Sequence, residues 1–212
     1  MGGTFCQIRL KDSDLVYFPV PKCASTSLKA ALLKDKRPDL FTVDEEGRET
    51  RPNVHRYFAE ARPLRLSDQL FVRGEWLCII RDPVERFVSG YRDRIHKTND
   101  LANVNLGNLP VQPEIDEFAA NLAVYMRASG SIRHHFRPMN DFLGKRPKRF
   151  DYVFNMNQMS ELIAFLNQHG IPVTLRHDRR SQARSVAVSH SLRRTIENFY
   201  ADDYRYWSAY LA

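Results

Sequence analysis

A lysine and three hydroxyl residues fill a short gap between an apolar run and a helix-like pattern. The apolar run is 15–20, and Lys22, Ser25, Thr26 and Ser27 follow it. A helix N-terminus presents unpaired backbone N–H groups and about half a positive charge, which suits a phosphate-like anion. Lys22 adds a full charge, and the hydroxyls add short donors that can surround a tetrahedral oxyanion. We therefore predict that this loop binds such an anion; a hydroxyl N-cap beside a surface lysine is the simpler alternative.

An arginine ends a second apolar run, 75–81, directly before Asp82 and Pro83. Phosphate-loop NTPases normally place at such a strand end an Asp that holds Mg²⁺. Arg81 instead suits a second anionic group, which its guanidinium binds through paired hydrogen bonds, and Ser89 adds a hydroxyl further along. Two anion sites without an evident metal carboxylate predict a nucleotide with two separate anionic groups and a metal-free transfer. An Arg–Asp surface pair at a helix start is the alternative.

Strands and helices must position these two loops. Short apolar runs predict strands at 15–20, 75–81, 150–156 and 171–177. Periodic patterns predict helices at 25–33, 55–61, 83–95, 114–126, 159–169 and 189–210, the first of them capped by Ser25 or Thr26. Loops are predicted at 34–53 and 98–113, and residues 176–186 are basic and polar. Strands that alternate with helices predict an α/β fold: a parallel β-sheet flanked by helices, P-loop-like, with ligand sites at the carboxyl ends of the strands.

Composition limits the class of protein. The 212 residues are 43% hydrophobic and 27% charged, which predicts a single globular domain over residues 1–212. The 32 basic and 25 acidic residues give a net charge of +7, which favours anionic partners without choosing among them; a basic surface kept for solubility is the alternative.

The cysteines and the hydropathy bear on location. Cys6, Cys23 and Cys78 are far apart in sequence, which favours reduced thiols over a disulfide framework or a zinc site. No segment reaches about 18 consecutive apolar residues, and residues 1–15 lack the apolar core of a signal peptide. We therefore predict a cytoplasmic protein. The alternative is the lumenal catalytic domain of a Golgi enzyme whose anchor has been removed.

The two loops together resemble the sulfotransferases that use 3′-phosphoadenosine 5′-phosphosulfate (PAPS). "VPKCASTSLKAAL" resembles their 5′-phosphosulfate loop, which typically reads Pro-Lys-x-x-x-Thr/Ser-Ser/Thr. "IIRDPVERFVSGYRDRI" resembles their 3′-phosphate segment, in which an Arg and a Ser are separated by seven residues. Within that family the chain most resembles the carbohydrate sulfotransferases of the chondroitin and heparan 2-O types and their bacterial relatives.

Later segments resemble the same family, so the similarity runs over most of the chain. "HHFRPMNDFL", residues 134–143, is similar to its His-x-x-Pro-Gln segment, with Met139 in place of the usual Gln. "FDYVFNMNQMSELIAFL" resembles the strand and helix that follow, with Asn157 where the family often has Glu. "HDRRSQ", residues 177–182, lies where the family has a basic loop over the nucleotide. "FYADDYRYW" resembles its final helix, and we predict that its aromatic side chains belong to the core.

The resemblance implies a role for each donor-side candidate. The 5′-phosphosulfate would be held by Lys22, Cys23, Ala24, Ser25, Thr26 and Ser27. Lys22 would also meet the negative charge that grows on the bridging oxygen as the S–O bond breaks. The 3′-phosphate would be held by Arg81, Ser89, Arg180 and Ser181.

The acceptor hydroxyl needs a base, and enzymes of the family place a His or Glu between the two nucleotide motifs. His55 is the only histidine in that interval, and an unperturbed imidazole accepts a proton near its pKa of about 6.5. We predict His55 as the base, with Glu60 and Glu75 as rivals and a solvated surface histidine as the simpler alternative. His135 is predicted to bind the acceptor substrate.

These residues predict a PAPS-dependent O-sulfotransferase. It would move a sulfuryl group to an acceptor hydroxyl on a carbohydrate and release adenosine 3′,5′-bisphosphate. No metal is predicted, because a sulfuryl group carries less charge than a phosphoryl group, and no nucleic acid partner is predicted. The alternatives are a Mg²⁺-dependent ATP kinase of the P-loop class, and a non-enzymatic basic module that binds acidic polysaccharide or nucleic acid with steep salt dependence.

Overall fold

The structure is a computed structural model that describes residues 7–10, 13–45, 49–50, 52–59, 73–174 and 187–211. The chain divides into two compact units. Unit 1 is Met1–Ile80 with Arg146–Gln182, and unit 2 is Arg81–Lys145 with Ala183–Ala212. Cys6, Glu60, Arg180 and Ser181 lie outside the described residues.

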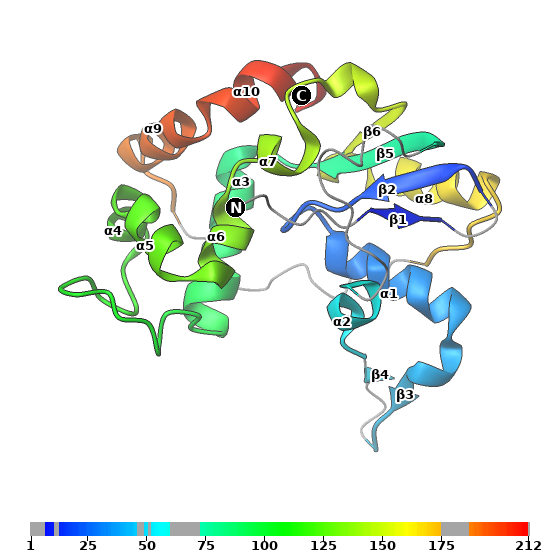
Figure 1. Ribbon diagram of the computed structural model, residues 1–212, viewed down its shortest axis with the longest axis horizontal. Helices are drawn as coiled ribbons and strands as arrows, with labels where there is room; N and C mark the ends of the chain where they lie inside the picture. Colours follow the sequence, from blue (N-terminus) through cyan, green and yellow to red (C-terminus); the bar gives the residue numbers. More distant parts are fainter. Residues whose placement is uncertain are drawn as a thin grey trace. The chain divides into compact units, whose positions relative to one another are not determined.

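Unit 1 is built on a four-stranded sheet in the order β1-β2-β5-β6. Its strands are β1 (Ile8–Arg9), β2 (Leu15–Phe18), β5 (Glu75–Ile80) and β6 (Tyr152–Asn155). The strands β2, β5 and β6 run parallel, whereas β1 is antiparallel to β2 (Figure 1). The two central strands are apolar without alternation over 15–18 and 77–80, and these side chains are buried on both faces of the sheet. The predicted α/β fold with a mostly parallel sheet is confirmed.

Helices follow the parallel strands of unit 1. After β2 comes α1 (Ser25–Lys36), after β6 comes α8 (Met159–Gln168), and α2 (Val54–Ala59) packs along α1. The remaining elements are short: η1 (Pro38–Leu40), the hairpin strands β3 (Thr42–Val43) and β4 (Glu49–Thr50), η4 (Pro147–Arg149) and η5 (Met156–Gln158).

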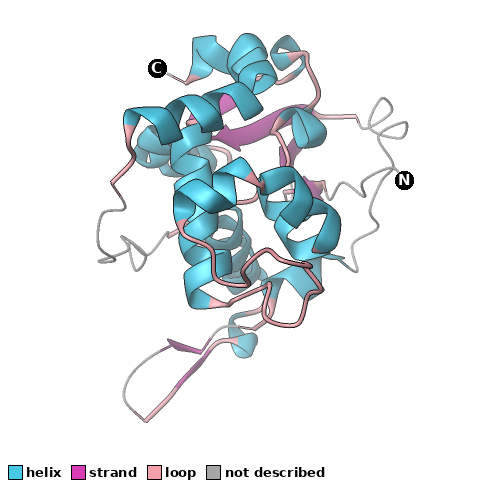
Figure 2. Cartoon of the chain, turned by 90° about the vertical axis from the view of Figure 1, so that its left-hand side faces the viewer, coloured by secondary structure: helices cyan, strands magenta, loops and turns pink. Residues whose placement is uncertain are grey.

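Unit 2 is helical in its described part. It contains α3 (Pro83–Tyr91), the π-helical turn η3 (Arg92–Lys97), α4 (Ile115–Ala120), α5 (Leu122–Ala128), α6 (Gly130–Phe136), α7 (Asn140–Leu143), α9 (His190–Phe199), α10 (Ala201–Trp207) and η6 (Ser208–Tyr210). In Figure 2 the strands of the described chain are confined to the sheet and the hairpin of unit 1.

An aromatic cluster forms the core of unit 2. The Phe118 ring lies 5.8 Å from the Phe87 ring and 4.9 Å from the Phe136 ring, measured between centroids. Phe136 also packs against Gly90, where an added Cβ would lie 2.9 Å from Phe136 Cζ. A glycine is therefore required at this point of α3.

Several predicted elements need correction. The predicted strand 171–177 is wrong in its described part, 171–174, which forms no strand. The Ile171 amide donates to the Leu166 carbonyl and the Val173 amide to Asn167 Oδ1, so this segment is tied to the end of α8 instead. The predicted helix 114–126 divides into α4 and α5. The predicted loop 34–53 contains the hairpin of β3 and β4. The strand β1 was missed because it has only two residues. One domain over 1–212 stays a prediction.

Candidate functional site

The loop after β2 has an unusual backbone. Lys22 and Ala24 both adopt left-handed conformations, with φ of 67° and 54°. For residues other than glycine this conformation costs about 1–2 kcal/mol each, and such strain gathers at ligand sites and active sites. The buried Cys23 lies between them, and its amide donates to the Val20 carbonyl at 3.3 Å. The loop is therefore held in a strained turn that directs its backbone into the first turn of α1.

The predicted hydroxyl cap of α1 is wrong. Ala24 is the N-cap residue, and no side chain caps the helix. The hydroxyl residues instead lie one position further on, within the first turn, where Ser25 is buried and Thr26 and Ser27 are half-buried. The left-handed Ala24 shifts the helix start, because it lets the Leu28 amide donate to the Ala24 carbonyl. The start of α1 thus combines backbone N–H groups without a side-chain cap and three hydroxyls, which is the arrangement that an oxyanion needs.

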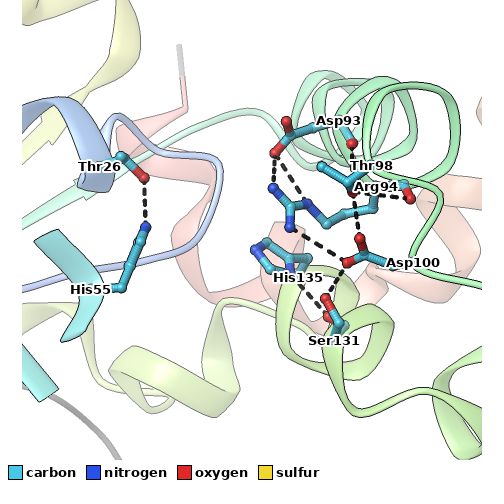
Figure 3. Close-up of polar contacts among 8 residues, drawn as sticks. All are labelled: Thr26, His55, Asp93, Arg94, Thr98, Asp100, Ser131 and His135. Carbon is cyan, nitrogen blue, oxygen red and sulfur yellow. Dashed lines mark hydrogen bonds and ion pairs between the residues drawn. The ribbon is translucent and has the colours of Figure 1, made fainter. Parts of the chain in front are cut away.

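His55 lies at this first turn. Its Nε2 atom is 3.1 Å from Thr26 Oγ1 (Figure 3). Asn53 caps α2 by accepting a hydrogen bond from the Arg56 amide, and the buried Val54 and Phe58 fix α2 on its other face, so the exposed His55 is presented on a defined helical turn. The sequence showed only that His55 lies between the two predicted nucleotide motifs. In the structure it contacts Thr26, a residue of the predicted donor loop.

The rival base Glu75 lies elsewhere in unit 1. It is the first residue of β5, at the amino end of the strand. The loop after β2 lies at the carboxyl end of the parallel strands, about 16 Å away at about 3.3 Å per residue. The structure therefore favours His55 over Glu75, and the third rival, Glu60, lies outside the described residues.

The segment after β5 opens α3. Asp82 is its N-cap residue, and Asp82 Oδ1 accepts hydrogen bonds from the amides of Val84 at 2.9 Å and Glu85 at 3.1 Å. Arg81 does not pair with Asp82, as the alternative suggested; its Nε donates to Glu85 Oε2 at 3.2 Å. Glu85 and Ser89 are spaced by four residues and lie on one side of α3, and the contact with Glu85 directs the Arg81 side chain to that side. Arg81 and Ser89 are half-buried and therefore accessible to a ligand.

His135 lies in α6 of unit 2 beside a polar network. Its Nδ1 donates to the Ser131 carbonyl at 2.9 Å, and in the neutral ring this leaves the lone pair on Nε2 (Figure 3). The Ser131 hydroxyl bonds Asp100, which also pairs with Arg94 at 3.4 Å. Burial tends to raise the pKa of Asp100, but hydrogen bonds from Ser131, Thr98 and Arg94 outweigh it and hold the pKa below its usual range. His135 is thus held in one tautomer on an ordered, ionised network.

Sequence reasoning missed Arg86. Its side chain is 1% exposed, and one terminal nitrogen donates to the carbonyls of His135 at 3.2 Å and Arg137 at 2.9 Å. No local pattern could have found it, because Arg86 lies nearly opposite the apolar stripe of Val84 and Phe87 on α3, and its two carbonyl partners are 49 and 51 positions away. Arg86 links α3, which carries Ser89 and follows Arg81, to the segment that carries His135.

Met139, which stands where the resemblance expects Gln, is fully buried. An apolar side chain in this position contributes to packing and offers no hydrogen bond to a substrate. The segment around it is held by its backbone instead, because the Met139 amide donates to Asp203 at 2.7 Å.

Three further observations concern the described residues only. A cavity of about 250 Å³ lies near the last turns of α1, lined in part by Leu32, Lys36 and Phe58, and it includes none of the predicted site residues. No group of three or more His, Cys, Asp or Glu side chains in the described ranges is arranged to hold a metal ion. No described helix combines the length and apolar character that a membrane span requires.

Comparison with known proteins gives one result. The model of a family described as "Sulfotransferase family" matches residues 8–210. No curated protein and no solved structure matches the chain.

Proposed function

The chain belongs to the sulfotransferase family and is a transferase of sulfuryl groups, and we propose that it moves a sulfuryl group from PAPS to a hydroxyl of a carbohydrate. The observation that carries this proposal is the start of α1. A strained loop with Lys22 at its tip leads into a helix with no side-chain cap, and His55 contacts Thr26 in the first turn. A donor loop and a candidate base are therefore present together within unit 1.

The donor loop supplies electrostatic stabilisation in this proposal. Lys22 and the residues Cys23 to Ser27 would bind the 5′-phosphosulfate through the lysine charge, backbone N–H groups and hydroxyls. As the bond between sulfur and the bridging oxygen breaks, its electron pair stays on the nucleotide phosphate. Lys22 would stabilise that growing charge, which makes it a catalytic residue.

His55 would act on the acceptor. A neutral imidazole takes the proton of the acceptor hydroxyl while the acceptor oxygen forms its bond to sulfur. The contact with Thr26 supports this role, because it keeps the ring beside the loop that would hold the sulfuryl group. The ring is exposed, so an acceptor can reach it.

The second donor segment would bind the 3′-phosphate. Ser89 lies in α3 and Arg81 directly before its N-cap residue, and the helix start adds its positive end. Arg180 and Ser181 would complete this site. Family membership supports sulfuryl transfer over the kinase alternative.

The acceptor class and the location belong to the same proposal. A carbohydrate is supported by the resemblance of the motifs and by the basic surplus of the chain, with His135 on the acceptor side. A cytoplasmic location is supported by Cys23 and Cys78, which are present as buried thiols.

Isothermal titration calorimetry with adenosine 3′,5′-bisphosphate tests the proposal. We expect micromolar affinity, weakened about 10- to 100-fold by Lys22→Ala or Arg81→Ala, since each removes a charged hydrogen bond worth about 1.5–3 kcal/mol. Lys148→Ala is the matched control, because Lys148 is exposed in η4, before the amino end of β6. Absence of binding by the wild-type chain would falsify the proposal.

A screen with labelled PAPS then identifies the acceptor. Glycans, lipids and phenols are offered in parallel, in the presence of EDTA. Labelled product from glycans alone supports the carbohydrate proposal, and labelling of phenols or lipids alone overturns it. A requirement for Mg²⁺ would contradict the metal-free transfer.

A further inference from the structure

The C-terminal helix presents polar atoms on its buried face. Tyr200, Asp203, Tyr204 and Trp207 are spaced by three and four residues, so they lie on one side of α10 and the residue before it. Tyr200, Asp203 and Trp207 are at most 1% exposed. The sequence predicted that the aromatic side chains of 199–207 belong to the core; burial confirms this for Tyr200 and Trp207, but the prediction is wrong for Phe199, which is 37% exposed.

Three of these side chains anchor the helix to other parts of unit 2. The Tyr200 hydroxyl donates to the Phe136 carbonyl at 2.5 Å. The Asp203 carboxylate accepts from the amides of Met139 at 2.7 Å and Asn140 at 2.9 Å. Trp207 Nε1 donates to Asn140 Oδ1 at 3.0 Å. Because these bonds are buried, they hold α10 firmly in place.

The fourth side chain reaches the start of α3. The Tyr204 hydroxyl donates to Asp82 Oδ2 at 2.8 Å. The other oxygen of the same carboxylate, Oδ1, caps α3 by accepting from the amides of Val84 and Glu85. Burial and the bond to Asp82 raise the pKa of the Tyr204 hydroxyl, so it remains a donor throughout the physiological range. Both oxygens of Asp82 are thus committed, one to the helix and one to α10.

We propose that Tyr204 is a positioning residue for the 3′-phosphate segment, acting through Asp82 on Arg81 and the first turn of α3. This inference rests on the proposed function. Arg81 directly precedes Asp82, so the direction of its guanidinium depends on how firmly that peptide and the helix start are held. Without the Tyr204 bond, the Asp82 carboxylate can rotate away from its capping position and the first turn loosens.

The test compares two nucleotides on the full chain. Adenosine 3′,5′-bisphosphate and adenosine 5′-phosphate differ only in the 3′-phosphate, so the ratio of their dissociation constants measures that contact. We expect Tyr204→Phe to reduce the wild-type preference for the bisphosphate about five- to tenfold, which is less than the effect of losing a hydrogen bond to the phosphate itself, because Tyr204 acts through Asp82. Binding of adenosine 5′-phosphate stays unchanged.

Two further variants make the test specific. Adding Tyr204→Phe to Asp82→Asn removes the same hydroxyl when the carboxylate that it acts through is already gone, so in that background Tyr204→Phe should change the preference by less than about twofold. Tyr204→Leu also lacks the hydroxyl and serves if Tyr204→Phe fails to fold. Tyr206→Phe is the matched control: it removes a hydroxyl from the same helix and keeps the ring that Lys145 Nζ approaches at 5.3 Å. Tyr206→Phe should retain the full preference.

The outcomes separate the inference from the function on which it rests. A wild-type chain that binds both nucleotides equally overturns the proposed 3′-phosphate site and this inference with it. A wild-type preference that survives in Tyr204→Phe, or that Tyr204→Phe lowers as much in the Asp82→Asn background as in the wild type, overturns the positioning role alone. An equal loss of affinity for both nucleotides also overturns it, because that pattern indicates general destabilisation.

Discussion

Replacing Glu85 by Gln should strengthen nucleotide binding. In the structure Arg81 Nε donates to Glu85 Oε2 at 3.2 Å, and the two side chains are 26% and 57% exposed. An exposed pair of this kind contributes only about 0–1 kcal/mol. In the proposed function the same guanidinium binds the 3′-phosphate. The Glu85 carboxylate would then repel that phosphate, and removing its charge relieves the repulsion.

The size of the effect follows from Coulomb's law. A phosphate on the far edge of the guanidinium fork would lie about 6 Å from the Glu85 carboxylate, given ordinary hydrogen-bond lengths. In water the repulsion is about 0.7 kcal/mol per unit charge, or about 1.2 kcal/mol for a phosphate of charge about −1.75. Screening leaves about half of this at 150 mM salt and most of it at 10 mM. We therefore expect affinity to rise about two- to threefold at 150 mM salt and about fivefold at 10 mM.

Calorimetry with adenosine 3′,5′-bisphosphate at both salt concentrations measures this change. Glu197→Gln is the matched control, since Arg193 and Glu197 form the same kind of i,i+4 pair on α9, at 3.6 Å. The control should leave the affinity nearly unchanged. A weaker affinity in Glu85→Gln would refute the reasoning, because it would mean that Glu85 orients Arg81 for the phosphate. A gain that does not shrink with added salt would refute it as well.

Three other variants test the predicted base His55, the aromatic core of unit 2 and the polar network around Asp100. His55→Ala should lower turnover of labelled PAPS by about 100-fold or more, the usual contribution of a general base, while adenosine 3′,5′-bisphosphate affinity changes less than about fivefold; unchanged turnover removes His55 from the mechanism. Gly90→Ala places a Cβ 2.9 Å from Phe136 Cζ, so urea unfolding should show a loss of about 1–3 kcal/mol, and a loss below about 0.5 kcal/mol contradicts the described packing. Hydrogen bonds hold the pKa of Asp100 below its usual range, so its contribution to stability is present above the unfolded pKa of about 3.9 and is lost as the pH falls through the folded value. Asp100→Asn should thus cost about 1–3 kcal/mol at pH 7 and progressively less below about pH 4; a cost independent of pH would show that the charge is not involved.

The sequence was informative wherever a local pattern determines the structure. The apolar runs that became β2, β5 and β6 needed only their composition to be recognised, and the strand ends then located both candidate loops. Pro83 correctly marked the first turn of α3. Gly170, with φ of 71°, follows the end of α8 as predicted.

The errors arose where the structure is determined by a backbone conformation or by a contact with a residue outside the local pattern. The hydroxyl-rich turn was expected to cap α1, but the left-handed Ala24 placed the helix start one residue earlier. The run 171–174 has the composition of a strand, yet its amides bond the end of α8. The contact between Thr26 and His55 joins residues 29 positions apart, so no local pattern predicts it.

The C-terminal helix shows why a buried face can be recognised while its role is missed. A period of three and four residues indicates burial, but it does not reveal what the polar ends of the buried side chains contact. The two partners of Asp203 lie 64 and 63 positions away, and the partner of Tyr204 lies 122 positions away. One feature of the sequence nevertheless pointed to them: Asp203 occupies the same face as Tyr200 and Trp207. A carboxylate that is 0% exposed must be hydrogen-bonded, because an unpaired buried charge is too costly. An aspartate within an aromatic helical stripe therefore predicts that this face also binds groups elsewhere in the fold, and here those groups include the backbone amides of Met139 and Asn140.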